Sequence, residues 1–294
     1  MGVICLADRE KGPNGLKIII ITVVAVAVVL SGVLIAVSYY YSHAQFGAVD
    51  HAFTETSEYS AVDNYSIILT AQHGNVVLVP TNNSLVKVTA ESWAYFFTSA
   101  DVNINETASN NTFTFVITSS QQGFKATEIR LYAPTNVIAR SFNISTNNGN
   151  INFNFQSSAS SLSLDTTNGG ITVVSELVQN VRGSTENGNI DVNLVQTNNV
   201  SLDSQNGGIS MKVTDPIISG TQSIVTTNGG VTIQINPLSK LSLSAVTTNG
   251  AVSYSGLNIA TSISTPSKLV GTLNGGGGTM SLATVNGGIT ISSI

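Results

Sequence analysis

The dipeptide Asn-Gly recurs at a nearly constant interval through the second half of this 294-residue chain, and no other feature limits the fold as strongly. Seven copies stand in similar contexts, such as TTNGGI, TENGNI and SQNGGI, with the asparagines at Asn148, Asn168, Asn187, Asn206, Asn228, Asn249 and Asn286. Successive intervals are 20, 19, 19, 22, 21 and 37 residues. The last interval is close to two periods, which predicts a degenerate unit around the glycine run at 275–278.

Apolar residues hold fixed places around each asparagine. They stand six and four residues before it and three and five after it, as around Asn168 in Leu162, Leu164, Ile171 and Val173. Alternation on both sides predicts two short strands, each with one buried face, joined by a tight corner. Gly183 and Gln222 depart from this rule. Because asparagine tolerates and glycine prefers positive φ, we expect Asn-Gly to turn the chain without strain.

Two architectures use such a pattern. Asn-Gly between alternating strands is the strongest hairpin signal and would give an antiparallel meander. Alternatively, each unit is one coil of a solenoid whose equivalent strands stack in parallel about 4.8 Å apart. The parity of the apolar positions fits both, but the nearly constant period with the same residues at every corner favours the solenoid. We therefore expect an all-β solenoid with ladders of Thr, Asn and Ser around a narrow aliphatic interior.

Composition excludes several classes of protein. Only 9% of residues are charged, yet 42% are hydrophobic, so the chain has the means to pack a core. The 11 basic residues are scattered singly, which argues against a nucleic-acid partner because phosphate binding needs a clustered basic surface. Cys5 is the only cysteine, so no intrachain disulfide can form and packing alone must hold the fold.

A membrane segment precedes the repeat. Residues 18–41 carry no charge, and twenty apolar residues span roughly 30 Å as a helix, the thickness of a bilayer core. The stretch is longer than the apolar region of a cleaved signal peptide, which favours a signal anchor. Arg9, Lys11 and Lys17 precede it, and the next basic residue is Lys87. The positive-inside rule then predicts a single-pass protein of the cell membrane with a cytoplasmic N-terminus and an extracellular C-terminal domain.

The predicted organisation follows from these segments. Residues 1–16 form a cytoplasmic tail, residues 17–41 the transmembrane helix, and residues 42–63 a stalk without periodicity. The extracellular solenoid then fills residues 64–294. Within it, residues 64–142 are rich in aromatic side chains and suit a cap and first rungs, because a solenoid end must cover its core. Residues 143–294 supply the regular rungs.

The repeat resembles a known group of domains. The segments NGNINFN and NGNIDVN, together with TAQHGNVVLV and EIRLYAPTN, are similar to the "putative adhesin" domain family of uncharacterised function and to the related head-GIN domain. The likeness covers residues 64–294 and is strongest over 126–292. It implies a single-stranded, right-handed parallel β-helix and a role at the cell surface. It implies no catalytic residue, because the family has none to carry over.

Candidate catalytic residues are sparse. His43 and His51 fall in the expected stalk, and His73 falls at a corner without the carboxylate that a catalytic triad needs. Asp165 and Asp203 occupy equivalent places three residues before a corner asparagine, with Ser184 between them in the stack. Strand spacing puts those two carboxylates about 10 Å apart, and capping of turns is the simpler role for them. We therefore expect no enzymatic activity, no cofactor and no metal.

Function follows as a hypothesis from this architecture. We expect an adhesin-like binding or structural protein on the cell surface, held by its helix in the membrane and contacting surface glycans or coat proteins. A carbohydrate-active β-helix enzyme and a subunit of a surface filament are the alternatives. N-glycosylation sequons stand at six sites in the predicted exterior part, although chance alone accounts for that number: Asn64, Asn82, Asn105, Asn110, Asn143 and Asn199.

Overall fold

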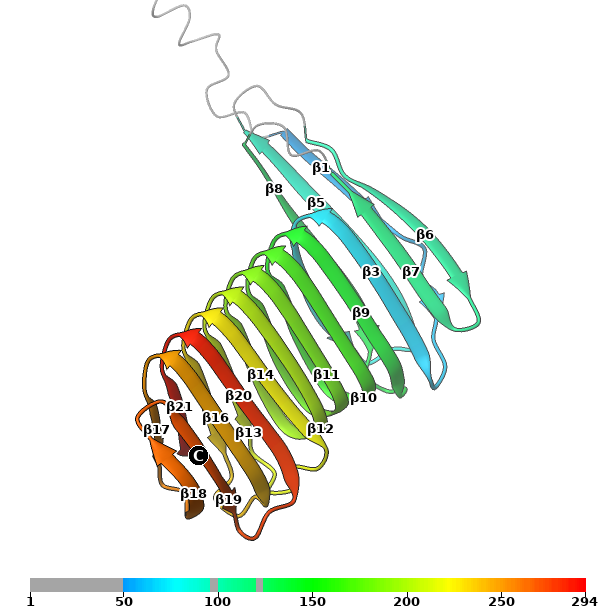
Figure 1. The fold of residues 1–294 in the computed structure, drawn as a ribbon. Coiled ribbons are helices and arrows are strands. Elements are labelled where there is room, and N and C mark those ends of the chain that lie inside the picture. The colour runs from blue at the N-terminus through cyan, green and yellow to red at the C-terminus, as the bar shows by residue number, and fades with distance from the viewer. Residues whose placement is uncertain (1–49, 96–99, 120–123) are drawn as a thin grey trace, which may run out of the picture. The chain divides into compact units, whose positions relative to one another are not determined.

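The computed structural model describes residues 50–95, 100–119 and 124–294, which belong to one compact unit (Figure 1). Regular structure in these ranges is entirely β, in 21 strands, which confirms the predicted all-β class. The predicted tail, the transmembrane segment at 17–41 and His43 lie outside the described residues. Across the ranges that are described, no helix is long and apolar enough to cross a membrane.

The strands form two layers that face each other across the core, and each layer is named here by its place in Figure 1. The front sheet runs in the order β6 (Asn103–Ser109), β7 (Thr112–Thr118), β3 (Tyr65–His73), β9 (Ala139–Asn148), the second halves of β10 (Ile151–Asn168), β11 (Ile171–Asn187) and β12 (Ile190–Asn206), then β14 (Thr221–Asn228), β20 (Gly278–Asn286), β16 (Leu241–Asn249), β19 (Lys268–Leu273) and β18 (Ile259–Thr265).

The rear sheet combines the strands that follow each corner with three antiparallel strands at its N-terminal end. It runs in the order β1 (Asp50–Glu55), β5 (Leu85–Tyr95), β8 (Phe124–Pro134), β4 (Asn75–Thr81), the first halves of β10, β11 and β12, then β13 (Ile209–Val213), β15 (Val231–Ile235), β21 (Ile289–Ser293) and β17 (Val252–Ser255). A short strand, β2 (Tyr59–Ser60), also pairs with β5.

Equivalent strands of successive repeats pair in parallel and in register. Asn168 pairs with Asn148 on one side and Asn187 on the other, and Asn206 pairs with Asn228. The corners therefore lie over one another, as the solenoid prediction required, and are not tips of antiparallel hairpins. The handedness of the coil stays a prediction.

The core lies between the two sheets and holds the residues at the predicted inward positions. Near the N-terminal end it is aromatic: Phe142, Phe153 and Phe155 are fully buried, with ring centroids of Phe142 5.1 and 5.0 Å from those of the other two. Farther along it is aliphatic. The two predicted exceptions point inward as well: Gly183 pairs with Leu202, and the buried amide of Gln222 donates to the carbonyl of Asn198 at 2.6 Å.

The corner asparagines form a continuous ladder of side-chain hydrogen bonds. Each Nδ2 donates to the Oδ1 of the asparagine on the adjacent rung, through Asn148, Asn168, Asn187, Asn206, Asn228, Asn286 and Asn249. These six bonds measure 2.7–3.0 Å. At the other end, Nδ2 of Asn148 lies 3.0 Å from Nδ1 of His73, which occupies the corner of the rung formed by β3 and β4.

Glycine follows each asparagine because the corners approach too closely for a side chain. A Cβ atom placed on Gly207 would lie 1.9 Å from the carbonyl oxygen of Gly188, and the same clash recurs at Gly169 and Gly229. The expected reason was different and is wrong for most rungs: none of the corner asparagines has positive φ, and among the corner glycines only Gly74 and Gly149 do.

A hydroxyl group completes each corner. The residue two before the asparagine is Thr or Ser, is buried, and donates to the carbonyl oxygen of the neighbouring corner glycine at 2.7–3.2 Å. Thr166 bonds to Gly149 in this way, and Ser204 bonds to Gly188. The hydroxyl thus gives the glycine carbonyl a hydrogen-bond partner within the corner, an interaction worth roughly 0.5–1.5 kcal/mol.

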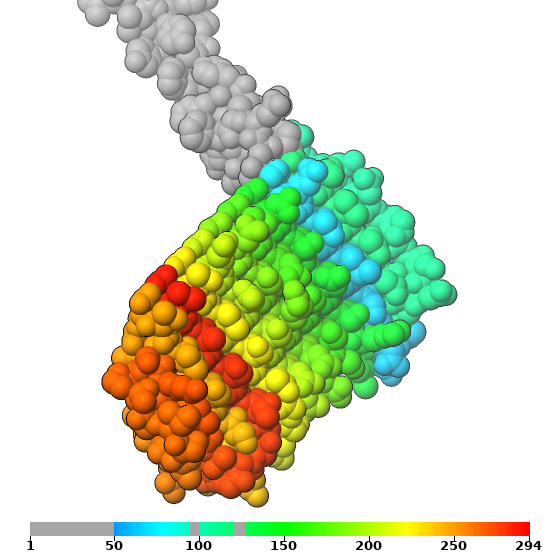
Figure 2. Space-filling model, viewed as in Figure 1, coloured from blue at the N-terminus to red at the C-terminus, as the bar shows by residue number. Residues whose placement is uncertain are grey.

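The last repeat does not follow its predecessor in the stack. β20 pairs with β14 on one edge and with β16 on the other, so Asn286 lies between Asn228 and Asn249. Figure 2 shows it as a red band between yellow and orange bands. The predicted degenerate rung at 275–278 is therefore wrong.

Glycine is required in that run for local reasons. Gly275 and Gly276 both have φ of +84°, and a Cβ on Gly277 or Gly278 would lie 2.5 Å from a neighbouring carbonyl oxygen. The run carries the chain from β19 back into the stack.

Antiparallel strands close the ends of the rod. At the C-terminal end, β18 and β19 extend the front sheet as a hairpin, whereas β17 is the free edge of the rear sheet. Tyr254 of β17 stands five residues after Asn249, a position that the repeat predicts to be buried. It stays 41% exposed because no further rung covers it, although its register partner Ile291 is fully buried.

At the N-terminal end the predicted stalk is partly wrong. Residues 50–60 fall within it and nevertheless form β1 and β2, both antiparallel to β5. Thr56 bonds with Val88 of β5 twice, since its backbone nitrogen donates to the carbonyl of Val88 and its hydroxyl accepts from the nitrogen of Val88, each at 2.9 Å. This pairing removes the exposed edge that β5 would otherwise present.

The corner geometry makes a paired prediction about two adjacent glycines. Gly207→Ala should lower the free energy of unfolding by about 3 kcal/mol, because its Cβ meets a backbone oxygen that cannot move without shifting a rung. Gly208→Ala should change it by less than about 0.5 kcal/mol, because its nearest neighbour lies 3.4 Å away. Urea unfolding of the full chain measures both values. Equal effects of the two substitutions would contradict the close-approach explanation.

The His73 end of the ladder predicts a dependence of stability on pH. Asn148 can only donate through Nδ2, so Nδ1 of His73 must accept and the ring must be neutral. Burial lowers the pKa of His73 below its ordinary value of 6.5. The folded state therefore favours the neutral ring, so this contribution is present above pH 6.5 and is lost as the pH falls through the folded pKa.

His73→Asn should remove that loss, since asparagine continues the ladder without titrating. We expect the urea midpoint of the unsubstituted chain to fall more between pH 7.5 and pH 5 than that of the variant. All other titrating groups are common to the two proteins, so parallel curves would show that His73 contributes nothing.

Candidate binding surfaces

The outer side of the front sheet is a flat field of hydroxyl and amide groups. Seven and five residues before each corner, side chains point outward in two columns, which contain Ser161, Ser163, Asn180, Arg182, Asn199, Ser201, Thr221, Ser223, Thr279, Ser281, Ser242 and Ser244. Adjacent members stand about 4.8 Å apart, the spacing of paired strands. Figure 2 shows the successive rungs side by side over this face.

Hydrogen bonds along the columns hold these side chains in place. Nδ2 of Asn199 donates to Oδ1 of Asn180 at 2.9 Å, and the backbone nitrogen of Thr221 donates to Oδ1 of Asn199 at 2.9 Å. The hydroxyl of Thr279 donates to that of Thr221 at 3.3 Å. The side chains of Asn180, Asn199, Thr221 and Thr279 are therefore oriented before any ligand arrives.

A shallow depression of about 510 Å³ lies on this face around Arg182. The guanidinium is exposed and forms no ion pair with any residue in the described ranges. Ser163 and Ser201 occupy the same column on the rungs at either side. The lining of the depression thus offers one exposed positive charge among neutral hydroxyl and amide groups, which suits a ligand rich in oxygen.

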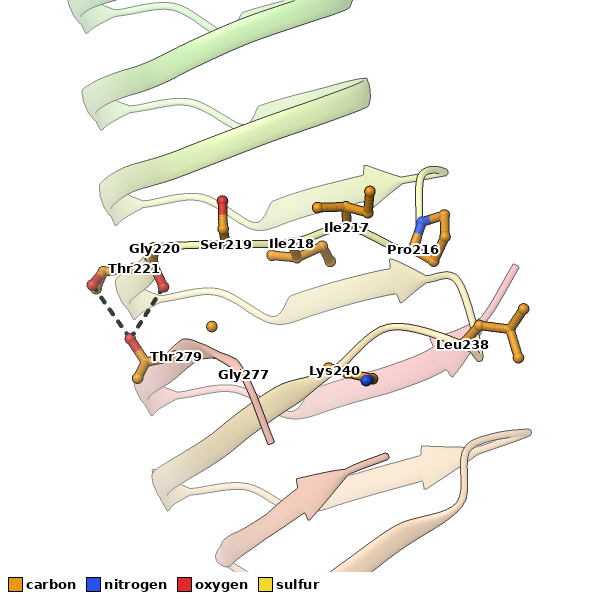
Figure 3. A pocket seen from close by; sticks show the side chains of 11 residues that line it. Pro216, Ile217, Ile218, Ser219, Gly220, Thr221, Leu238, Lys240, Gly277 and Thr279 are labelled. Atoms are coloured by element: carbon orange, nitrogen blue, oxygen red, sulfur yellow. Dashed lines mark hydrogen bonds between the residues drawn. The ribbon is translucent and has the colours of Figure 1, made fainter. Parts of the chain in front are cut away.

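A larger groove of about 720 Å³ lies where the inserted rung meets its neighbours (Figure 3). Its apolar part includes Ile217 and Leu238, which are 61% and 72% exposed. Its polar part includes the hydroxyls of Thr221 and Thr279. Lys240 is the only ionisable side chain among the lining residues, so these residues supply no acid and base pair.

The residues considered for catalysis are not assembled into a site. Asp165 and Asp203 are separated in the stack by Ser184, as predicted, and Asp165 accepts a hydrogen bond from Ser163 at 3.3 Å. His73 belongs to the corner ladder. Within the described residues, no group of three or more His, Cys, Asp or Glu side chains could hold a metal ion.

The six sequon asparagines are all exposed. Asn64 and Asn110 lie in turns with φ of 65° and 49°, and Asn199 is the least free because its amide bonds to Asn180. Glycosylation at these residues stays a prediction. All seven predicted corner asparagines lie at corners of the stack.

Sequence reasoning missed both depressions. The groove follows from intervals of 22 and 21 residues, longer than the usual 19, which leave room for loops containing Pro216 and Pro237. Those long intervals were the available signal. Arg182 could have been found as the only charged residue in the two outward columns.

Comparison with known proteins places the chain in a family. No curated protein sequence matches it. Among solved structures, a "putative cell adhesion protein" of Clostridium sporogenes is 8% identical, with 83% of this chain and 100% of that chain covered and a TM-score of 0.34. A "putative adhesin" of Bacteroides fragilis is 13% identical, with 83% and 97% covered and a TM-score of 0.38. At these scores the likenesses say nothing about what this chain binds.

A family model identifies the chain more directly. The model described as Toastrack DUF4097 matches residues 64–216, which is more than half of the 294 residues. The matched range begins one residue before β3 and runs through the rungs of β9 to β13. The resemblance to an uncharacterised adhesin-like family is thereby confirmed, and the chain belongs to the Toastrack DUF4097 family, whose fold is solenoid-like and all-β.

Proposed function

We propose that this protein is a non-catalytic binding module of the cell surface, anchored by its N-terminal apolar helix and contacting surface glycans through the front sheet. The single observation that carries the proposal is the flat field of outward hydroxyl and amide groups around the exposed guanidinium of Arg182. An oxygen-rich polymer with repeating hydroxyl groups is the partner that this chemistry recognises best.

Rigidity supports a binding role. Each outward group stands on a rung held by an Asn–Asn bond, a buried hydroxyl and parallel pairing on both sides, as at Asn187. Little conformational entropy is then lost when a ligand is bound, and this loss is one of the main costs of association. Single contacts between neutral groups are weak, so affinity arises from many of them acting together along the rod.

The membrane anchor supports a location outside the cell. The apolar stretch at 18–37 is long enough to span a bilayer, and the basic residues Arg9, Lys11 and Lys17 precede it. The body of the protein carries little charge, and hydroxyl and amide groups dominate two columns of its front face. Such a surface stays hydrated without attracting ions, as an exposed rod needs.

Substitution on the two faces of the same rungs tests the proposal. Ser201→Glu with Ser223→Glu places negative charge at two outward sites of the front sheet, and Ser210→Glu with Thr232→Glu does the same on the rear sheet. We expect the front pair to reduce attachment of beads coated with the full chain to glycan-coated surfaces at least tenfold. The rear pair should leave attachment nearly unchanged.

Arg182→Ala should weaken attachment as well, because it removes the only charge of the depression. Thermal unfolding of each variant checks that the stack is intact. If neither the front pair nor Arg182→Ala reduced attachment, the front face would be refuted as the contact surface. Release of sugar fragments from the glycan would establish the enzymatic alternative instead.

A further inference from the structure

Three antiparallel strands at the N-terminal end carry a surface unlike the rest of the molecule. β1, β5 and β8 continue the rear sheet, and their outward side chains are aligned by the register of His51 with Trp93, Phe53 with Glu91, and Glu91 with Glu128. The set formed by His51, Phe53, Glu91, Trp93, Glu128 and Arg130 is called the aromatic–ionic patch below. Labels in Figure 1 locate the three strands.

The patch concentrates ionic groups in a chain that has few. Arg130 donates to Glu91 at 3.2 Å and to Glu128 at 2.7 Å, and Nε2 of His51 lies 3.8 Å from the second oxygen of Glu91. Every ion pair between described residues lies on these three strands, including that of Lys87 with Glu55 at the rim. Exposed pairs add little stability, so stability alone does not explain such a concentration.

Aromatic rings beside these charges form a platform. The rings of His51 and Trp93 are stacked, with centroids 5.5 Å apart and planes inclined by 25°. Phe53 lies two residues farther along β1, about 7 Å away by strand geometry, and is 52% exposed. The other ring pairs in the described part of the chain involve residues of the core, such as Phe142 with Phe153.

The polar atoms of the patch are fixed yet accessible. The side chain of Glu91 is 21% exposed, and those of Glu128 and Arg130 are 35% and 40% exposed. Each carboxylate keeps lone pairs that Arg130 does not use, and these can accept hydrogen bonds from hydroxyl groups. The two carboxylates and one guanidinium together carry a net charge of −1, which disfavours an anionic ligand.

We propose that the aromatic–ionic patch binds one pyranose ring of a neutral or amino sugar, with the apolar face of the ring on Phe53 and Trp93 and its hydroxyl groups on Glu91, Glu128 and Arg130. The inference rests on the proposed binding role but uses none of the front-sheet residues. The patch would supply specificity for one sugar unit, whereas the front sheet supplies extended contact with a polymer.

The only tryptophan of the chain is Trp93, so its fluorescence reports on the patch without a label. Titration of the purified full chain with maltotriose, cellotriose, mannotriose, chitotriose and chitosan trimer should give a saturable change in emission with at least one of them. Sulfated heparin trisaccharide should give none. The proposal would be overturned if no neutral or amino sugar altered the emission at millimolar concentration. It would also be overturned if the protein bound the sulfated trisaccharide more tightly than the others.

Variants separate binding from support of the edge strand. Phe53→Ala should raise the dissociation constant roughly tenfold, the loss of affinity expected for one aromatic stacking contact. Glu91→Gln keeps the shape of the side chain, so it tests the polar contacts even if Phe53→Ala loosens β1, and it should weaken binding by a similar factor. Tyr254→Ala is the matched control, because Tyr254 is also partly exposed but lies on β17.

The remaining outcomes are also decisive. Affinity unchanged in Phe53→Ala and Glu91→Gln would overturn the site even if the sugar binds elsewhere. A shift of Trp93 emission with phosphatidylcholine vesicles and not with sugars would make the patch a membrane contact instead. A negative result in this experiment does not affect the test by front-sheet substitutions, so the two proposals are tested separately.

Discussion

The structure depends on the close approach of glycine backbones at its corners. Each corner glycine points its carbonyl oxygen at the Cα of the next, at a separation that excludes a Cβ atom. Only this approach brings the asparagine amides of adjacent rungs to 2.7–3.0 Å and the buried Thr or Ser hydroxyls within reach of the glycine carbonyls. Three residue types at one corner therefore satisfy one another: glycine allows contact, the hydroxyl satisfies the buried carbonyl, and asparagine extends the ladder.

Because every corner solves the same problem in the same way, any corner can stack on any other. That equivalence explains how Asn286 pairs as well with Asn228 as with Asn249, although the chain reaches it last. It also explains which features of the fold the sequence alone does not predict. The spacing of Asn-Gly predicts the corners, the inward residues and the parallel register, because these are local and repeated. It does not encode the order of rungs, which depends on the β18–β19 hairpin and on the glycine run that returns β20 into the stack.

Departures from the repeat were the hardest features to predict. Residues 50–55 have no period that marks them as a strand; they form one because β5 needs a partner on its outer edge. The burial of Tyr254 was inferred from a pattern that assumes another rung above it, and the stack ends there. Trp93, Glu91 and Arg130 come together only through antiparallel registers that join residues about forty positions apart, so no local motif announces them.

The contrast between regular rungs and antiparallel end strands suggests different binding roles for the two parts of the structure. A stack of equivalent rungs can offer only a periodic surface, since the residue at each outward site recurs every 19 to 22 positions with small changes. Such a surface suits extended, repetitive ligands and discriminates poorly among them. Discrimination requires several unlike groups at one place, which a regular stack cannot provide. It becomes available where the repeat gives way to antiparallel strands, and there charged side chains gather beside the aromatic rings of His51, Phe53 and Trp93. The end of the solenoid is therefore where a selective contact is expected to evolve.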